Sequence, residues 1–123
     1  MDKYQQTLKN IDKFNRDRHW KNLSLEDLAK SICIESAELL EHFQWSSSRK
    51  KIRDTEKISL EVADIFWYLA TFCHEAKIDL LIAMAKKIKI LETKYPKEVF
   101  AEKAVSEEIY LKYKQEYRNK FGR

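Results

Sequence analysis

The scarcity of glycine and proline is the strongest constraint on the fold of this chain. Its 123 residues include one glycine, Gly122, and one proline, Pro96. β-Turns, bulges and barrel corners draw heavily on both residue types, so a β-rich fold is disfavoured. A chain of this length suits a single domain, here residues 1–123. We therefore expect an all-α protein, an antiparallel helical bundle of about four core helices plus a C-terminal helix.

The same scarcity restricts how the chain can bind phosphate. Walker loops and dinucleotide fingerprints need several glycines, because backbone must approach the phosphate closely. Residues 1–121 contain none. If this protein handles phosphates, it must use side chains and a metal ion.

Charge and cysteine content narrow the class of protein. The formal net charge is +4, from 24 basic and 20 acidic residues. No basic stripe follows a helix, so a nucleic-acid partner is not expected, although a nucleic-acid-binding helical protein remains the least favoured alternative. The basic run at residues 49–53 is either a solvated loop or a phosphate-attracting segment.

Cys33 and Cys73 lack CxxC spacing and are typical of reduced cysteines in a cytoplasmic protein. No apolar stretch approaches the roughly 20 residues of a membrane span.

Apolar periodicity and capping residues predict five helices, at about residues 3–18, 25–44, 54–77, 80–94 and 106–119. Ser24 is a good N-cap for the second helix, with Asp27 three residues later. Serines 46–48 and the basic run form the next loop. Tyr95 and Pro96 end the fourth helix, since a residue before proline avoids the α region.

Two carboxylates interrupt the apolar face of the second helix. This face is predicted from helical spacing to contain Leu25, Leu28, Ile32, Leu39 and Phe43. The series also predicts an apolar residue at position 35, where the chain has Glu35. Glu38 follows three residues later, on nearly the same face.

The third helix repeats this pattern. Its apolar stripe is predicted to contain Ile58, Ile65, Leu69 and Phe72. Glu61 shares that face, and Asp64 follows three residues later. Buried carboxylates are costly unless a cation neutralises them, and Mg²⁺ prefers oxygen ligands. Glu35, Glu38, Glu61 and Asp64 are therefore candidate Mg²⁺ ligands at the interface of two antiparallel helices.

Alternative roles for these residues stay open. A single pair of glutamates at this spacing is common on a solvated helix face. Di-iron bundles use E-x-x-H pairs, which are absent at these positions. His19, His42 and His74 lack the H-E-x-x-H spacing of zinc sites, and each is interpreted as a surface or partly buried side chain.

These elements resemble the MazG-like nucleotide pyrophosphohydrolases, most closely the dCTP-pyrophosphatase branch. Residues 34–45 read IESAELLEHFQW, similar to the family signature E-x-x-E-L-x-E-x-F-Q-W. Residues 61–65 read EVADI and resemble the E-[LV]-x-D-[VI] element. The segments DRHW at 17–20, IDL at 78–80 and KYP at 94–96 also match in order. The resemblance covers about residues 10–97, and residues 98–123 form a charged extension.

The resemblance implies an all-α fold that assembles as a homodimer or a dimer of dimers. It implies hydrolysis of a nucleoside triphosphate between the α and β phosphates, giving the monophosphate and pyrophosphate, with pyrimidine nucleotides as the substrate class. By position, the four carboxylates match the ligands of Mg²⁺, for which Mn²⁺ can substitute. Trp20 and Trp45 match residues that enclose the base, while Lys87 and Tyr95 match polar residues lining the nucleotide site.

The chain departs from the family at three places. The asparagine often found four residues before the Tyr-Pro pair is Leu91 here. The segment after the first tryptophan is altered at residues 21–24, and an upstream histidine is replaced by Ile11. The loss of these groups affects recognition of the base and leaves the metal carboxylates unchanged.

Glu38 is the preferred group to orient or deprotonate the attacking water, and Glu41 is the alternative. Lys87 and the basic run are candidates for stabilising the phosphates. A rival hypothesis is a non-catalytic helical module, derived from the same family, that binds nucleotide or protein.

Overall fold

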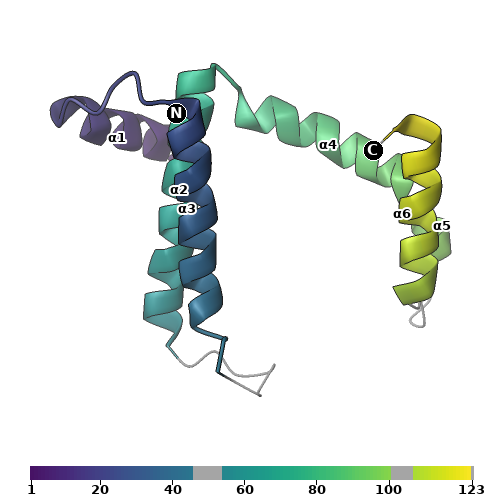
Figure 1. The fold of residues 1–123 in the computed structure, drawn as a ribbon. Coiled ribbons are helices and arrows are strands. Elements are labelled where there is room, and N and C mark those ends of the chain that lie inside the picture. The colour runs from purple at the N-terminus through teal and green to yellow at the C-terminus, as the bar shows by residue number, and fades with distance from the viewer. Residues whose placement is uncertain (46–53, 101–106, 123) are drawn as a thin grey trace. The chain divides into compact units, whose positions relative to one another are not determined.

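The computed structural model describes residues 1–45, 54–100 and 107–122, and every regular element in these ranges is an α-helix (Figure 1). The all-α prediction is therefore confirmed. The helices are α1 (Lys3–Asp17), α2 (Leu25–Glu41), α3 (Thr55–Ala76), α4 (Leu80–Lys94), α5 (Lys97–Phe100) and α6 (Glu107–Phe121). The chain divides into two compact units, Met1–Asp79 and Leu80–Arg123, which are described separately. None of the described helices is long and apolar enough to cross a membrane.

The predicted helix boundaries agree well with the structure, with two differences. The Ser24 side chain accepts a hydrogen bond from the backbone of Asp27, as its N-cap position predicted. α2 ends at Glu41, three residues early, and residues 42–45 continue in hydrogen-bonded turns. The short α5 after Pro96 was not predicted, because four residues carry little periodicity. The predicted loop at serines 46–48 and the basic run lies outside the described residues, as does Ser106.

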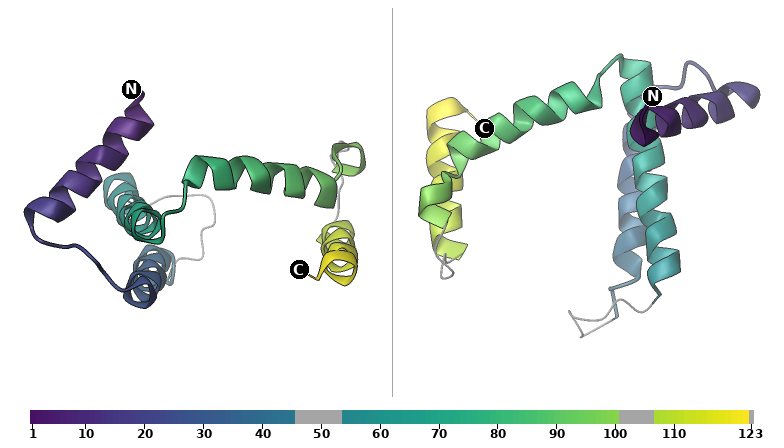
Figure 2. Two further views of the ribbon diagram at one scale, coloured as in Figure 1. Left: turned by 90° about the horizontal axis from the view of Figure 1, so that it is seen from above. Right: turned by 180° about the vertical axis from the view of Figure 1, so that it is seen from behind.

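In the first unit, α2 and α3 run antiparallel side by side, and α1 packs against α3 (Figures 1 and 2). The buried apolar side chains are Ile11 on α1, Leu28 on α2 and Ala70 on α3. Asn15 on α1 donates a buried hydrogen bond of 3.2 Å to the Thr71 hydroxyl on α3. This bond and the apolar contacts fix α1 against the C-terminal half of α3.

The predicted apolar stripes are only partly buried. Leu28 is buried as expected, but Leu25, Phe43 and Leu69 are more than one-third exposed. For these three residues the prediction is wrong for the single chain. The physical reason is that α2 and α3 cover only one side of each other, and α1 packs near Ala70 instead.

The end of α3 shows how a glycine-poor chain stops a helix. Lys77 adopts the left-handed conformation, with φ 57° and ψ 41°. The backbone N–H of Ile78 donates to the carbonyl of Cys73 at 2.8 Å, and that of Lys77 donates to the carbonyl of His74 at 3.3 Å. These two hydrogen bonds form the Schellman pattern. Glycine usually takes this position, because a Cβ makes the conformation costly. The helix therefore ends through a strained lysine.

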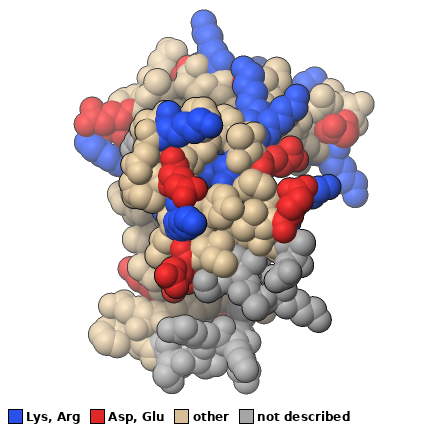
Figure 3. All heavy atoms as spheres, turned by 90° about the vertical axis from the view of Figure 1, so that its right-hand side faces the viewer, with Lys and Arg blue, Asp and Glu red and all other residues tan. Residues whose placement is uncertain are grey.

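In the second unit, aromatic rings that follow α4 pack against rings on α6. The rings of Tyr95 and Tyr110 stack at 5.1 Å, and Phe100 meets Tyr113 edge-on at 5.7 Å. On the face drawn in Figure 3, basic and acidic side chains lie beside one another rather than in separate patches of one charge. The bundle of about four core helices and the single domain remain predictions.

Candidate metal centre

Three of the predicted ligands meet at the interface of α2 and α3. Glu35, Glu38 and Glu61 each offer a carboxylate oxygen, and these atoms all lie within 4.8 Å of one another. All three side chains are partly buried. We call these three residues the acidic cluster. It lies in the C-terminal half of α2 and the N-terminal half of α3, whereas α1 contacts the other half of α3.

Glu35 experiences the strongest electrostatic effect in the cluster. Burial of the carboxyl raises its pKa most, followed by a hydrogen bond with Glu38 and the negative charges of Glu38, Asp64 and Glu61. Together they raise the pKa of Glu35 from 4.5 to about 7. Its Oε2 atom is buried and has no hydrogen-bond partner in the part of the chain that the structure describes. A cation at this position would offset both the desolvation and the repulsion.

Local structure explains how the cluster forms. Residues 35 and 38 are one turn apart, so both side chains lie on the face of α2 that meets α3. Ser24 caps α2, and Asp54 caps α3 by accepting from the Lys57 backbone at 3.0 Å. The two caps set where each helix begins and therefore which residues face the interface.

The fourth predicted ligand, Asp64, lies outside the group whose oxygens meet within 4.8 Å. It is exposed on α3, one turn after Glu61. Its charge still contributes to the raised pKa of Glu35, so it shares the electrostatic environment of the cluster. The role of Asp64 as a metal ligand remains a prediction.

Sequence reasoning missed the environment of His42. Its Nε2 atom lies 3.5 Å from Oε1 of Glu61, and both side chains are about three-quarters buried, with 23% and 24% exposed. The spacing shows only that His42 shares a helix face with Glu35 and Glu38, because these positions are three and four residues apart. The interpretation of a partly buried histidine was correct, but its contact with Glu61 was not foreseen.

The two candidate base-binding tryptophans lie beyond opposite ends of α2. Trp20 precedes the helix, is 50% exposed and meets Phe14 edge-on at 5.9 Å. Trp45 follows the helix and is 84% exposed. The 17 residues of α2 span roughly 25 Å at 1.5 Å per residue. One chain therefore does not bring the two rings together around a single base.

Lys87 and Tyr95 belong to the second unit. Lys87 is exposed on α4, and Tyr95 follows the end of that helix. Tyr95 is engaged by its stack on Tyr110, and a hydrogen bond between the two raises the pKa of Tyr95 and lowers the pKa of Tyr110. Their relation to the acidic cluster remains a prediction.

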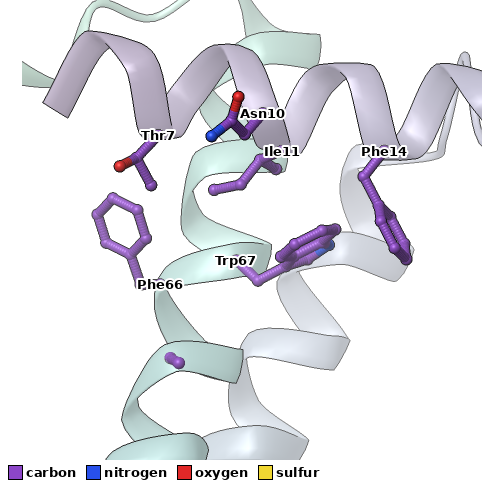
Figure 4. A pocket seen from close by; sticks show the side chains of 7 residues that line it. Thr7, Asn10, Ile11, Phe14, Phe66 and Trp67 are labelled. Atoms are coloured by element: carbon purple, nitrogen blue, oxygen red, sulfur yellow. The ribbon is translucent and has the colours of Figure 1, made fainter. Parts of the chain in front are cut away.

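A hollow of about 370 Å³ between α1 and α3 is distinct from the cluster (Figure 4). Its lining is mostly apolar and aromatic: Thr7, Asn10, Ile11, Phe14, Ala63, Phe66 and Trp67. The three α3 residues lie about opposite Glu61 around the helix. The hollow is part of the contact of α1 with α3, and no acidic side chain lines it.

The residues of the acidic cluster fit a hard divalent cation. Their donors are carboxylate oxygens, which Mg²⁺ and Mn²⁺ prefer. The buried Oε2 of Glu35 accepts no hydrogen bond from any residue within 1–45, 54–100 and 107–122, and the neighbouring negative charges disfavour ionisation of this carboxyl in the absence of a cation. Both observations are explained if this oxygen is a ligand atom.

Comparison with known proteins indicates the family of this chain. No curated protein matches the chain significantly. The model of the MazG-like family matches residues 30–109, which is more than half of the chain. The matched range includes all four candidate ligands as well as Trp45, Lys87 and Tyr95, and it begins after Trp20. The chain therefore belongs to the MazG-like family.

Proposed function

We propose that this protein is a Mg²⁺-dependent nucleoside triphosphate pyrophosphohydrolase. It cleaves between the α and β phosphates and releases a nucleoside monophosphate and pyrophosphate. The observation that carries the proposal is the acidic cluster, in which three carboxylates converge and the buried Oε2 of Glu35 has no hydrogen-bond partner among the described residues. Membership in the MazG-like family independently suggests a nucleotide pyrophosphohydrolase.

In this proposal Glu35, Glu38 and Glu61 hold the cation, and Asp64 completes the ligand set. A divalent cation bound there supplies Lewis-acid polarisation of the phosphoryl oxygens and lowers the pKa of a coordinated water. The carboxylates would thereby determine where the triphosphate binds, because Mg²⁺ often takes substrate phosphate oxygens as ligands beside one or two carboxylates. Because residues 1–121 contain no glycine for a phosphate-binding loop, the chain would bind phosphate through these carboxylates and their cation.

Glu38 is the proposed general base. It is partly buried beside Glu35, within reach of any water held by the cluster. A carboxylate in that position orients the attacking water and accepts its proton. Glu41, the alternative base, is exposed and is not among the residues of the cluster. The exposure of Glu41 and its position outside the cluster therefore favour Glu38 as the general base.

The proposed substrates are pyrimidine nucleotides similar to dCTP. Trp20 and Trp45 supply aromatic faces for the base, and Lys87 and Tyr95 supply polar groups for the nucleotide. Because the two tryptophans lie beyond opposite ends of α2, a base enclosed by both would need rings from two chains. Leu91 replaces an amide common in this family, so the expected selectivity is broad.

We also propose that the chain functions as a homodimer or a dimer of dimers. Several large apolar side chains of α2 and α3 are more than half exposed in the single chain, namely Ile34, Leu40, Leu60 and Val62. Where exposed apolar side chains form a patch, that patch typically becomes buried in assembly. Light scattering should give at least twice the 14.8 kDa chain mass, and a monomer at micromolar concentration would contradict the assembly.

The function is tested by measuring pyrophosphate release from a panel of ribo- and deoxyribonucleoside triphosphates. We expect release that requires Mg²⁺ or Mn²⁺ and stops when the metal is chelated. Phosphorus NMR should identify pyrophosphate and the monophosphate as products. Orthophosphate and the diphosphate would indicate cleavage at the wrong bond. Nucleotide binding without turnover would favour the non-catalytic module instead.

A further inference from the structure

Helix α2 places His42 where it can act on the acidic cluster. The residue is the C-cap of α2, with φ −62° and ψ −19°, and its backbone N–H donates to the carbonyls of Leu39 and Leu40. Its backbone is therefore held by the helix end. Its ring lies on the face that already carries Glu35 and Glu38, and it reaches across to α3.

Across the interface the ring meets one ligand of the cluster. Nε2 of His42 lies 3.5 Å from Oε1 of Glu61. The partial burial of both side chains limits competition from water. The ring donates from Nε2 in the charged form, and also in the neutral tautomer that carries its proton on that atom.

The ring is placed to act through Glu61 rather than on the metal. The oxygens of Glu35, Glu38 and Glu61 converge within 4.8 Å, and that group does not include a nitrogen of His42. A donor on Oε1 restricts rotation of the Glu61 carboxylate. Carboxylates that ligate metals are commonly held by such outer hydrogen bonds, and their loss weakens metal affinity by about 10–100-fold.

We propose that His42 is a positioning residue, which donates to Glu61 and holds its carboxylate in the orientation that binds the cation. This inference rests on the proposed function of the acidic cluster. It assigns His42 a role in metal affinity, separate from the chemistry of the attacking water.

The test measures Mn²⁺ binding to the full chain by titration calorimetry, at one fixed pH. His42→Phe removes the donor and keeps an aromatic ring, and it should weaken binding about 10–100-fold. His42→Gln restores an N–H donor and should recover most of the affinity. In turnover, His42→Phe should raise the Mg²⁺ concentration for half-maximal rate more than it lowers kcat at saturating Mg²⁺.

His74 offers a matched control. Its Nε2 lies 3.2 Å from Oδ1 of Asp12, so it is also a histidine–carboxylate contact between two helices, but away from the cluster. His74→Phe should leave Mn²⁺ affinity unchanged. Thermal unfolding without metal checks that each variant is folded.

The outcomes separate this inference from the proposed function. If the wild type binds Mn²⁺ and releases pyrophosphate while His42→Phe binds equally well, the positioning role is wrong and the function stands. Equal losses in the Phe and Gln variants would show that an N–H donor at position 42 does not restore Mn²⁺ affinity, and would also overturn the proposal. If the wild type binds no Mn²⁺, both the function and this inference fail.

Discussion

A carboxylate oxygen of Glu35 on α2 lies within 4.8 Å of a carboxylate oxygen of Glu61 on α3. Two like charges at this separation repel, and partial burial reduces the screening by water. The two carboxylates come from different helices, and each stands on a helix face whose other residues are mostly apolar. A cation between the carboxylates converts the repulsion into attraction.

The stability of the metal-free protein should depend on pH through Glu35. Its pKa rises from 4.5 to about 7 in the folded chain, so the folded state binds more protons than the unfolded state between these values. The contribution of Glu35 to stability is therefore present below about pH 4.5 and is lost as pH rises through about 7. Urea unfolding of chelated protein across this range measures the effect.

Glu35→Gln provides the comparison for that titration. The variant cannot ionise, so it should be more stable than the metal-free wild type at pH 8, and the difference should shrink toward pH 5. Glu56→Gln, at an exposed position in the first turn of α3, is the control. A wild type and a Glu35→Gln variant with parallel pH profiles would contradict the raised pKa.

The α1–α3 contact should depend on the buried pair Asn15 and Thr71, which are 6% and 4% exposed. Thr71→Val keeps the shape and removes the hydroxyl, so the Asn15 amide N–H loses its acceptor. The Oδ1 atom of Asn15 already has no partner among the residues that the structure describes. The free energy of unfolding should fall by about 1–3 kcal/mol. Thr93→Val, at an exposed threonine, should change it by less than about 0.5 kcal/mol. Equal effects would show that the buried bond contributes nothing.

The left-handed lysine at the end of α3 should be a site for stabilisation. Lys77→Gly removes the steric cost of φ 57°, offset in part by the greater entropy of the unfolded chain. We expect a gain of roughly 0.5–1 kcal/mol in denaturant unfolding. Lys77→Ala keeps a Cβ and should bring no such gain. A loss of stability in the glycine variant would mean that the lysine side chain makes a stabilising contact.

Substrate selectivity should be broad because Leu91 cannot supply the hydrogen bonds of an amide. Several pyrimidine nucleotides should have kcat/KM values within about one to two orders of magnitude of one another, as about 1–3 kcal/mol of discrimination allows. Leu91→Asn should narrow the range or shift the preferred nucleotide, whereas Leu81→Asn on the same helix should not. A several-thousandfold preference in the native protein would place selectivity elsewhere, with residues 21–24 as the next segment to test.

The sequence predicted the helices and the acidic pairs because both depend on local spacing. Ser24 and Asp54 cap their helices through bonds that span three residues, and Glu35 stands out because its neighbours at helical spacing are apolar. The contact of His42 with Glu61 depends on how two helices lie against each other, and spacing within one helix does not contain that information. The exposure of Leu25 and Leu69 escaped prediction for a similar reason, since the pattern marks an apolar face without saying what covers it.

The most direct test of the proposed metal centre compares pyrophosphate release by three glutamine variants in saturating Mg²⁺. Glu35→Gln and Glu61→Gln each remove a charged ligand, and the cation supplies several kcal/mol of transition-state stabilisation, so each rate should fall by at least about 100-fold. Helix content, followed by circular dichroism, should stay at the wild-type level. Glu56→Gln should retain the wild-type rate. Full activity in both Glu35→Gln and Glu61→Gln would contradict the proposal, because it would show that the acidic cluster does not hold the catalytic metal.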